Sequence, residues 1–165
     1  MFKHTLPAGK YFIGDICYGM DHTIYNNSWC VEHNFEDGMF KCKNNYYVVH
    51  STKFGDGYYP SSTHDASGDA AKYGKYYYVD AGNIGIVHKS MMASGKKDCL
   101  NNLGSIHNFT GEVTFEYNDN GTFIIRCEQD DFALEIYTGE CPLSENLSGD
   151  DYDDADANCS SISDD

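Results

Sequence analysis

Three aspartates stand one or two positions from a glycine at separate places in the chain: Asp15, Asp56 and Asp80. Glycine adopts positive φ without strain and an Asp side chain accepts hydrogen bonds from nearby backbone N–H groups, so each segment is typical of a turn. If the three turns meet at one rim of a β fold, their carboxylates would form an acidic site for a divalent cation or for acid–base chemistry. Turn formation is the favoured interpretation, and the metal site is an alternative.

Cys17 stands two positions after Asp15 and is a candidate nucleophile. A thiol becomes nucleophilic when a histidine or another base lies beside it in space, and His50, His64 and His88 are available elsewhere in the chain. Asp15, Cys17 and His88 are therefore the catalytic candidates of a small hydrolase or transferase. The alternative is a buried thiol at a strand end, because the environment of a cysteine rather than its spacing decides its reactivity.

Tyrosines gather in two short runs, Tyr58-Tyr59 and Tyr76–Tyr78, in a chain that is 15% aromatic. Exposed tyrosines could form a platform for a carbohydrate or another ligand. The alternative is that these rings fill a core and pair across strands.

The elements that would position these residues are mostly strands. Apolar and polar residues alternate in 113–117, an Asn-Gly turn follows at 118–121, and a strand-like run returns over 122–127. After a reversal at 129–131, alternation resumes in 132–137, so residues 111–137 predict a three-stranded antiparallel meander.

Shorter apolar or aromatic runs upstream predict further strands, and two segments resemble helices. A helix capped by Asp21 is expected over 22–33, a weaker one over 91–103, and a mobile surface loop over 60–75. We predict a mainly β fold, a small antiparallel barrel or sandwich, with one or two short helices. The expected upstream strands are Lys10–Ile13, Met39–Cys42, Tyr46–Ser51, Tyr76–Val79 and Ile84–His88.

Length and charge predict one globular domain over 1–149 and a flexible acidic tail over 150–165. The 165 residues carry a net charge of −15, and the tail has seven aspartates without lysine or arginine. This balance argues against binding nucleic acid through its phosphates and against anionic membranes. No apolar run has the length of a membrane span or of a classical secretory signal, so we expect a protein of the host cytoplasm or of a virion. No cofactor is expected.

The seven cysteines include no C-x-x-C pair, which argues against a zinc ribbon or a thioredoxin-like site. Reduced and mostly buried thiols are the favoured interpretation. Cys127 and Cys141 stand near neighbouring predicted strands, and a disulfide between them is the alternative.

Three motifs occur in order along residues 6–88: P-x-G-x-Y-x-I-G-D-x-C-Y at 7–18, G-D-G-x-Y at 55–59 and V-D-A-G-x-I-G at 79–85. In this order they resemble a group of small proteins from bacteria, phages and large DNA viruses. The group has no established activity, so the resemblance implies a viral or mobile-element origin and no reaction.

Our leading functional hypothesis is a non-enzymatic accessory or virion-associated protein that binds a basic protein partner through an acidic surface. The small hydrolase or transferase and the tyrosine-based ligand-binding module remain as alternatives. The expected binding residues are Asp56, Asp80, Tyr58, Tyr59, Asp150, Asp151, Asp153, Asp154 and Asp156.

Overall fold

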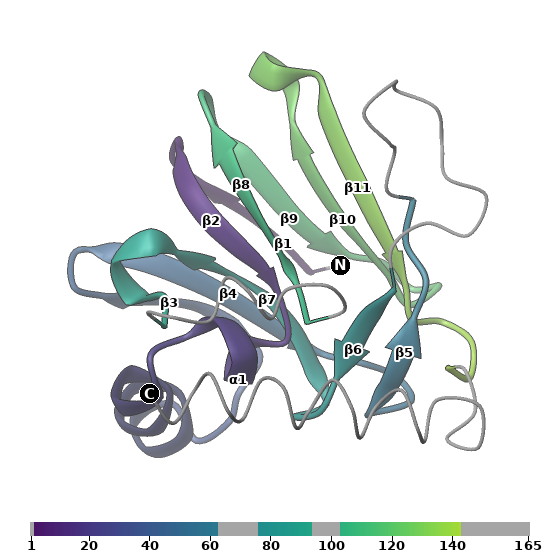
Figure 1. The fold of residues 1–165 in the computed structure, drawn as a ribbon, viewed down its shortest axis with the longest axis horizontal. Helices are drawn as coiled ribbons and strands as arrows, with labels where there is room; N and C mark the ends of the chain where they lie inside the picture. Colours follow the sequence, from purple (N-terminus) through teal and green to yellow (C-terminus); the bar gives the residue numbers. More distant parts are fainter. Residues whose placement is uncertain (1, 63–75, 94–102, 143–165) are drawn as a thin grey trace.

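The computed structural model describes residues 2–62, 76–93 and 103–142, and these residues form a mainly antiparallel β fold (Figure 1). The strands belong to separate sheets rather than to one closed barrel. A four-stranded sheet has the order β1-β9-β10-β11, with strands Phe2–Leu6, Val113–Tyr117, Thr122–Cys127 and Phe132–Tyr137. A five-stranded sheet has the order β3-β4-β7-β2-β8, with strands Gly38–Cys42, Asn45–Ser51, Asn83–His88, Gly9–Gly14 and Ser105–Phe109. A small sheet pairs β5 (Gly57–Tyr59) with β6 (Tyr77–Val79).

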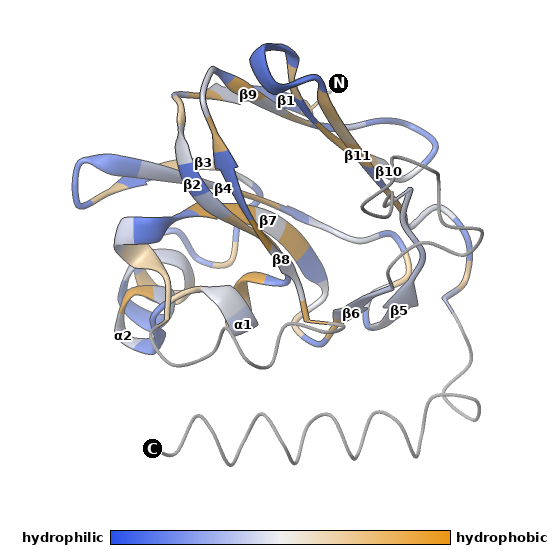
Figure 2. Cartoon of the chain, turned by 45° about the horizontal axis from the view of Figure 1, so that its top comes forward, coloured by the Kyte–Doolittle hydropathy of each residue, from blue (hydrophilic) through white to orange (hydrophobic). Residues whose placement is uncertain are grey.

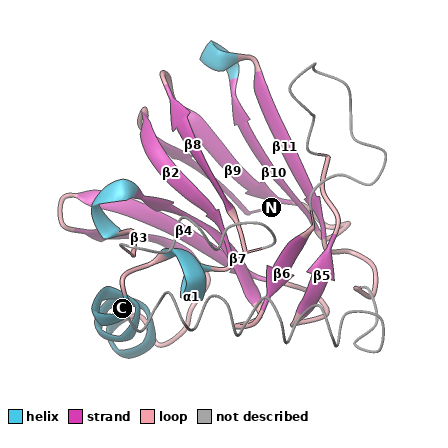
Figure 3. Ribbon diagram, in the orientation of Figure 1, coloured by secondary structure: helices cyan, strands magenta, loops and turns pink. Residues whose placement is uncertain are grey.

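The inner strands of the five-stranded sheet, β4, β7 and β2, are buried on both faces. On β2, Tyr11 and Ile13 belong to a core shared with the four-stranded sheet, whereas Phe12 belongs to a second core on the opposite face. Burial on both faces explains why the three inner strands contain continuous apolar runs instead of alternating ones. The second core is completed by short helices, which Figure 3 shows gathered on one side of the strands.

The predicted meander is confirmed as β9, β10 and β11. The Asn118 side chain accepts hydrogen bonds from the N–H groups of Asn120 and Thr122, and Gly121 has φ +79°, so the expected Asn-Gly chemistry makes the turn. Between β10 and β11, residues Glu128–Asp130 form a 3-10 turn (η4), and Asp131 reverses the chain in the left-handed conformation. Figure 2 shows hydrophilic residues at this reversal.

The helix predicted over 22–33 is present, but most of it has π-helical geometry. Asp21 accepts hydrogen bonds from the N–H groups of Thr23 and Ile24 and begins α2 (His22–Ile24), which continues as the π-helix η1 (Tyr25–Glu32). A further turn of helix, α1 (Ile16–Gly19), precedes it.

The other two segment predictions lie partly outside the described residues. Of the helix predicted over 91–103, residues 94–102 are outside; nearby, Lys89–Met91 is a 3-10 turn, η2. Of the loop predicted over 60–75, residues 60–62 are described and lie along the edge of β11, where Ser61 pairs with Ile136. Strands β1, β5 and β8 were not predicted.

Candidate functional site

The three Asp-Gly turns meet at one end of the five-stranded sheet, as the acidic-site hypothesis expected. Asp15 follows the last residue of β2, and the turn 80–82 leads into β7 directly beside it. The N–H of Thr52 donates to the carbonyl of Gly82 at 2.9 Å, which brings the third turn to the same end. There Asp56 Oδ1 lies 4.0 Å from the position that a Cβ on Gly82 would occupy.

Asp15 is fully buried, and backbone donors occupy its carboxylate. Oδ1 accepts the N–H of Cys17 at 2.9 Å, while Oδ2 accepts those of Asp80 and Ala81 at 2.7 and 2.6 Å. The Asn83 side chain reinforces the junction by accepting the N–H of Ile16 at 3.2 Å. Asp15 therefore ties the start of α1 to the turn before β7.

Burial raises the pKa of the Asp15 carboxyl to about 6. The hydrogen bonds from Ala81, Cys17 and Asp80 act in the opposite direction, because they favour the ionised form, but they do not offset the loss of water. A buried carboxyl with a raised pKa is also typical of catalytic acids and bases. The geometry around Asp15 therefore has to distinguish a structural role from a catalytic one.

The structure does not bring together the expected Cys-His pair. Cys17 is half-buried and its thiol contributes a hydrogen bond to Asp15. His88 pairs with Tyr11 across the sheet, whereas Asp15 lies beyond Gly14 at the other end of the same strand. Four residues separate Tyr11 from Asp15, and at a rise of about 3.3 Å per residue this places His88 roughly 13 Å from Asp15 along the strand direction. His88 therefore cannot be the base for Cys17 in this arrangement.

Of the two remaining candidates only His50 belongs to the described residues, and it is engaged elsewhere. His50 stacks on Tyr117 at a centroid distance of 4.0 Å, and its Nε2 lies 3.6 Å from Asp37. His64 lies outside the described residues. The groups near Asp15 and Cys17 are instead the phenol of Tyr18 and the carboxylate of Asp80. Burial first, and then the negative charge of Asp80, raises the pKa of Tyr18.

No metal centre forms among the described residues. They contain no group of three or more His, Cys, Asp or Glu side chains that could hold an ion. Asp56 and Asp80 have exposed side chains at the common end of the sheet, but Asp15 directs both oxygens at backbone N–H groups. Turn formation thus explains Asp15, whose oxygens accept backbone N–H groups, and the alternative of a metal site built on the three aspartates finds no ligand cluster among the described residues.

The expected tyrosine platform is largely internal. Tyr58, Tyr59, Tyr77 and Tyr78 are all at most 7% exposed, and the rings of Tyr58 and Tyr78 pack 4.8 Å apart across β5 and β6. These side chains fill cores, so the surface role predicted for Tyr58 and Tyr59 is wrong.

Carboxylates outnumber cations on β9, β10, β11 and their turns. Residues 110–142 contain a single cation, Arg126, and none of their carboxylates is buried or within 4.0 Å of a described lysine or arginine. A groove of about 440 Å³ crosses the outward face of the sheet, and the cations Lys3 and Arg126 are among its lining residues. Its acidic lining residues are Glu112, Glu116 and Glu128.

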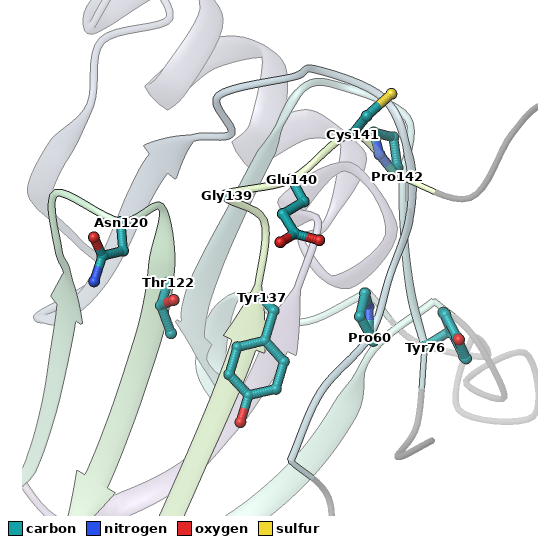
Figure 4. Close-up of a pocket in the computed structure, with 9 residues that line it drawn as sticks. All are labelled: Pro60, Tyr76, Asn120, Thr122, Tyr137, Gly139, Glu140, Cys141 and Pro142. Carbon is teal, nitrogen blue, oxygen red and sulfur yellow. The ribbon is translucent and has the colours of Figure 1, made fainter. Parts of the chain in front are cut away.

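A second concavity, of about 610 Å³, lies where β11 ends (Figure 4). We call it the tyrosine–glutamate pocket; it is lined by Pro60, Tyr76, Tyr137, Glu140 and Pro142, with Cys141 and the turn 120–122 at its border. The sequence did not predict it, because its walls come from separate segments that share no motif. The available signal was Tyr137, an aromatic residue at an outward position of its strand that remains 39% exposed.

The disulfide alternative for Cys127 and Cys141 is wrong in this structure. Both are free thiols: Cys127 is buried near Gly111 and Asp130, at the start of the β10–β11 reversal, whereas Cys141 is exposed beyond the far end of β11. The acidic tail of residues 150–165 lies outside the described residues.

None of the helices that the structure describes has the length and apolar character needed to span a membrane. No family model matches the chain, and neither the curated proteins nor the solved structures contain a match to it.

Proposed function

We propose that this chain is a non-enzymatic binding protein, of the accessory or virion-associated kind expected from its motifs, and that its acidic surface binds a basic protein partner. The observation that carries the proposal is the one-sided charge of residues 110–142. Their acidic side chains are Glu112, Glu116, Asp119, Glu128, Asp130, Asp131, Glu135 and Glu140, against Arg126 alone.

Geometry supports a binding surface over an active site. The buried acid at Asp15 has its oxygens occupied by backbone donors, whereas none of the described carboxylates of the four-stranded sheet is buried or within 4.0 Å of a described lysine or arginine. Hydrogen bonds from Thr110 lower the pKa of Asp130, so this carboxylate is ionised at neutral pH. Such a surface attracts a cationic protein and accelerates their encounter.

The acidic tail extends this charge. Residues 150–165 follow the four-stranded sheet in the sequence and add seven aspartates, among them Asp150, Asp151, Asp153, Asp154 and Asp156. At physiological ionic strength the screening length is about 8 Å, so these charges act mainly at contact. The tail and the sheet can therefore contribute separately to affinity for the partner.

A capture experiment with matched variants tests the proposal. The immobilised full chain is compared with Glu112→Gln/Glu128→Gln on the sheet, with a chain lacking residues 150–165, and with Glu32→Gln/Glu36→Gln on the exposed helical side. Captured proteins from source-cell lysate are quantified by mass spectrometry at 0.1 and 0.5 M salt.

The expected result is a partner richer in Lys and Arg than in acids, with capture weakened by the sheet variant, the tail deletion and high salt. The control pair should retain the partner, although it loses the same two charges as the sheet variant. A partner held equally by all four chains, or held independently of salt, contradicts the proposal.

A further inference from the structure

The walls of the tyrosine–glutamate pocket are fixed by hydrogen bonds. The N–H of Tyr137 donates to the carbonyl of Pro60 at 2.9 Å, and the N–H of Ser62 donates to the carbonyl of Glu135 at the same distance. Ser62 Oγ also accepts the N–H of Glu135 at 2.8 Å. Pro60 is therefore held beside the Tyr137 ring by the main chain.

The opposite side of the pocket is equally constrained. The N–H and Oγ1 of Thr138 both donate to the carbonyl of Gly121, which joins the end of β11 to the β9–β10 turn. Pro142 packs so closely on Gly57 of β5 that a Cβ at that glycine would overlap the proline ring. A pocket with such walls loses little conformational entropy when it is filled.

The lining of the pocket is aromatic and anionic. The Tyr137 hydroxyl donates to Glu135 Oε1 at 3.0 Å, which orients the ring and places a second carboxylate next to the pocket. In Figure 4 the Glu140 carboxylate points into the space between Tyr137 and Pro60, while the Cys141 thiol points outward. None of the described lining residues is a lysine, arginine or histidine.

We propose that this pocket binds the guanidinium group of an arginine side chain carried by the partner. A flat cation stacks on tyrosine and proline surfaces and pairs with a carboxylate through two parallel N–H donors. The inference rests on the proposed function, since the basic partner supplies the arginine. A sugar ring would also stack on tyrosine, but a described lining that holds a carboxylate and no cationic side chain, together with the net charge of −15, favours a cation.

A peptide titration tests the pocket without the partner. Amide chemical shifts of the ¹⁵N-labelled full chain are followed while Ac-Gly-Arg-Gly-NH2 is added, and the same peptide with citrulline in place of arginine serves as the uncharged isostere. Methyl β-glucoside is titrated in parallel. We expect the amides of Tyr137, Gly139 and Glu140 to shift with the arginine peptide alone, with a dissociation constant on the order of 1 mM.

Variants separate a specific site from general charge attraction. Glu140→Gln and Tyr137→Ala should each weaken binding about threefold or more, whereas Glu32→Gln, which removes the same charge as Glu140→Gln on the helical side, should change it by less than about 1.5-fold. Equal binding of the citrulline peptide, shifts that map away from the pocket, equal effects of the two glutamate variants, or a response to the glucoside alone would each overturn the inference. Because the titration contains no partner, these outcomes leave the proposed function to be decided by the capture experiment.

Discussion

Asp15 and Ala81 are 66 positions apart in the sequence, yet Asp15 Oδ2 accepts the N–H of Ala81 at 2.6 Å. The same oxygen accepts the N–H of Asp80, so one buried carboxylate joins the start of α1 to the turn before β7. This long-range contact closes the end of the five-stranded sheet, and its removal should affect stability more than any local contact there.

Replacing Asp15 with Asn should lower the free energy of unfolding by about 2 kcal/mol or more at pH 7. An amide has one acceptor oxygen, so its NH2 group would face a backbone N–H and leave buried donors without partners. Chemical denaturation measures the change. Asp80→Asn is the matched control, because that side chain is exposed and only its backbone N–H is used, and it should stay within about 0.5 kcal/mol of the wild type. Equal stability of the two variants would contradict the structural role of Asp15.

The raised pKa of Asp15 predicts a pH dependence. Burial raises this pKa from 3.8 to about 6, so between these values the folded chain holds a proton that the unfolded chain has lost. The stabilising contribution is complete below about pH 4 and is lost as the pH rises through about 6. Two pKa units correspond to roughly 3 kcal/mol. The stability advantage of the wild type over Asp15→Asn should thus shrink by about this amount between pH 4 and pH 7, whereas a flat difference would show that the N–H donors keep the carboxyl ionised throughout.

Among the described cysteines, Cys141 should react first with a thiol reagent and Cys127 last. Cys141 is exposed at the pocket border, whereas Cys127 is completely buried and needs local opening before it can react. Limited labelling at pH 7 followed by peptide mass spectrometry should give a rate ratio of at least about ten. Cys17, whose thiol contacts the Asp15 carboxylate rather than a histidine, should react more slowly than Cys141. Faster labelling of Cys17 would restore the nucleophile hypothesis.

The turn between β3 and β4 should be improved by the double change Lys43→Asn/Asn44→Gly. Lys43 and Asn44 have φ +54° and +65°, a pair of left-handed conformations for which Asn-Gly is the preferred sequence. Relief of this strain should raise the free energy of unfolding by about 1 kcal/mol, which corresponds to a melting temperature higher by roughly 2–4 °C. Lys41→Gly in the adjacent strand is the control and should lower it, because glycine there only adds unfolded-state entropy.

The meander was predictable because one face of its strands is buried and the other is exposed, which produces a period of two. Strand β1 has the same alternation, with Lys3 and Thr5 exposed, but it is short, ends at Pro7 and pairs with β9, more than 100 positions away. Strand β8 is likewise an edge strand with little apolar content. Local patterns do not reveal partners at such distances in the sequence.

The candidate site was predictable in part. Repetition of Asp beside Gly predicted three turns, and their meeting at one rim was the condition of the alternative acidic site, but the sequence could not show that Asp15 would be buried with its oxygens occupied. The tyrosine runs allowed two interpretations, because tyrosine rings occur both in cores and in ligand-binding platforms. In the structure Tyr58, Tyr59, Tyr77 and Tyr78 pack in the two cores. The tyrosine–glutamate pocket depends on the contact of Pro60 with β11, which no motif records.

The pairing of residues 60–62 with β11 also bears on self-association. An uncovered sheet edge offers backbone groups to strands of other molecules and promotes aggregation. Here the main-chain groups of Glu135 and Tyr137 are occupied by Pro60 and Ser62, so half of this edge cannot accept an added strand. The other half of the edge, around Ala133, directly follows the chain reversal that contains Asp130 and Asp131. Two copies that approached each other along this edge would bring these negative charges together, and their repulsion opposes the pairing of identical edges.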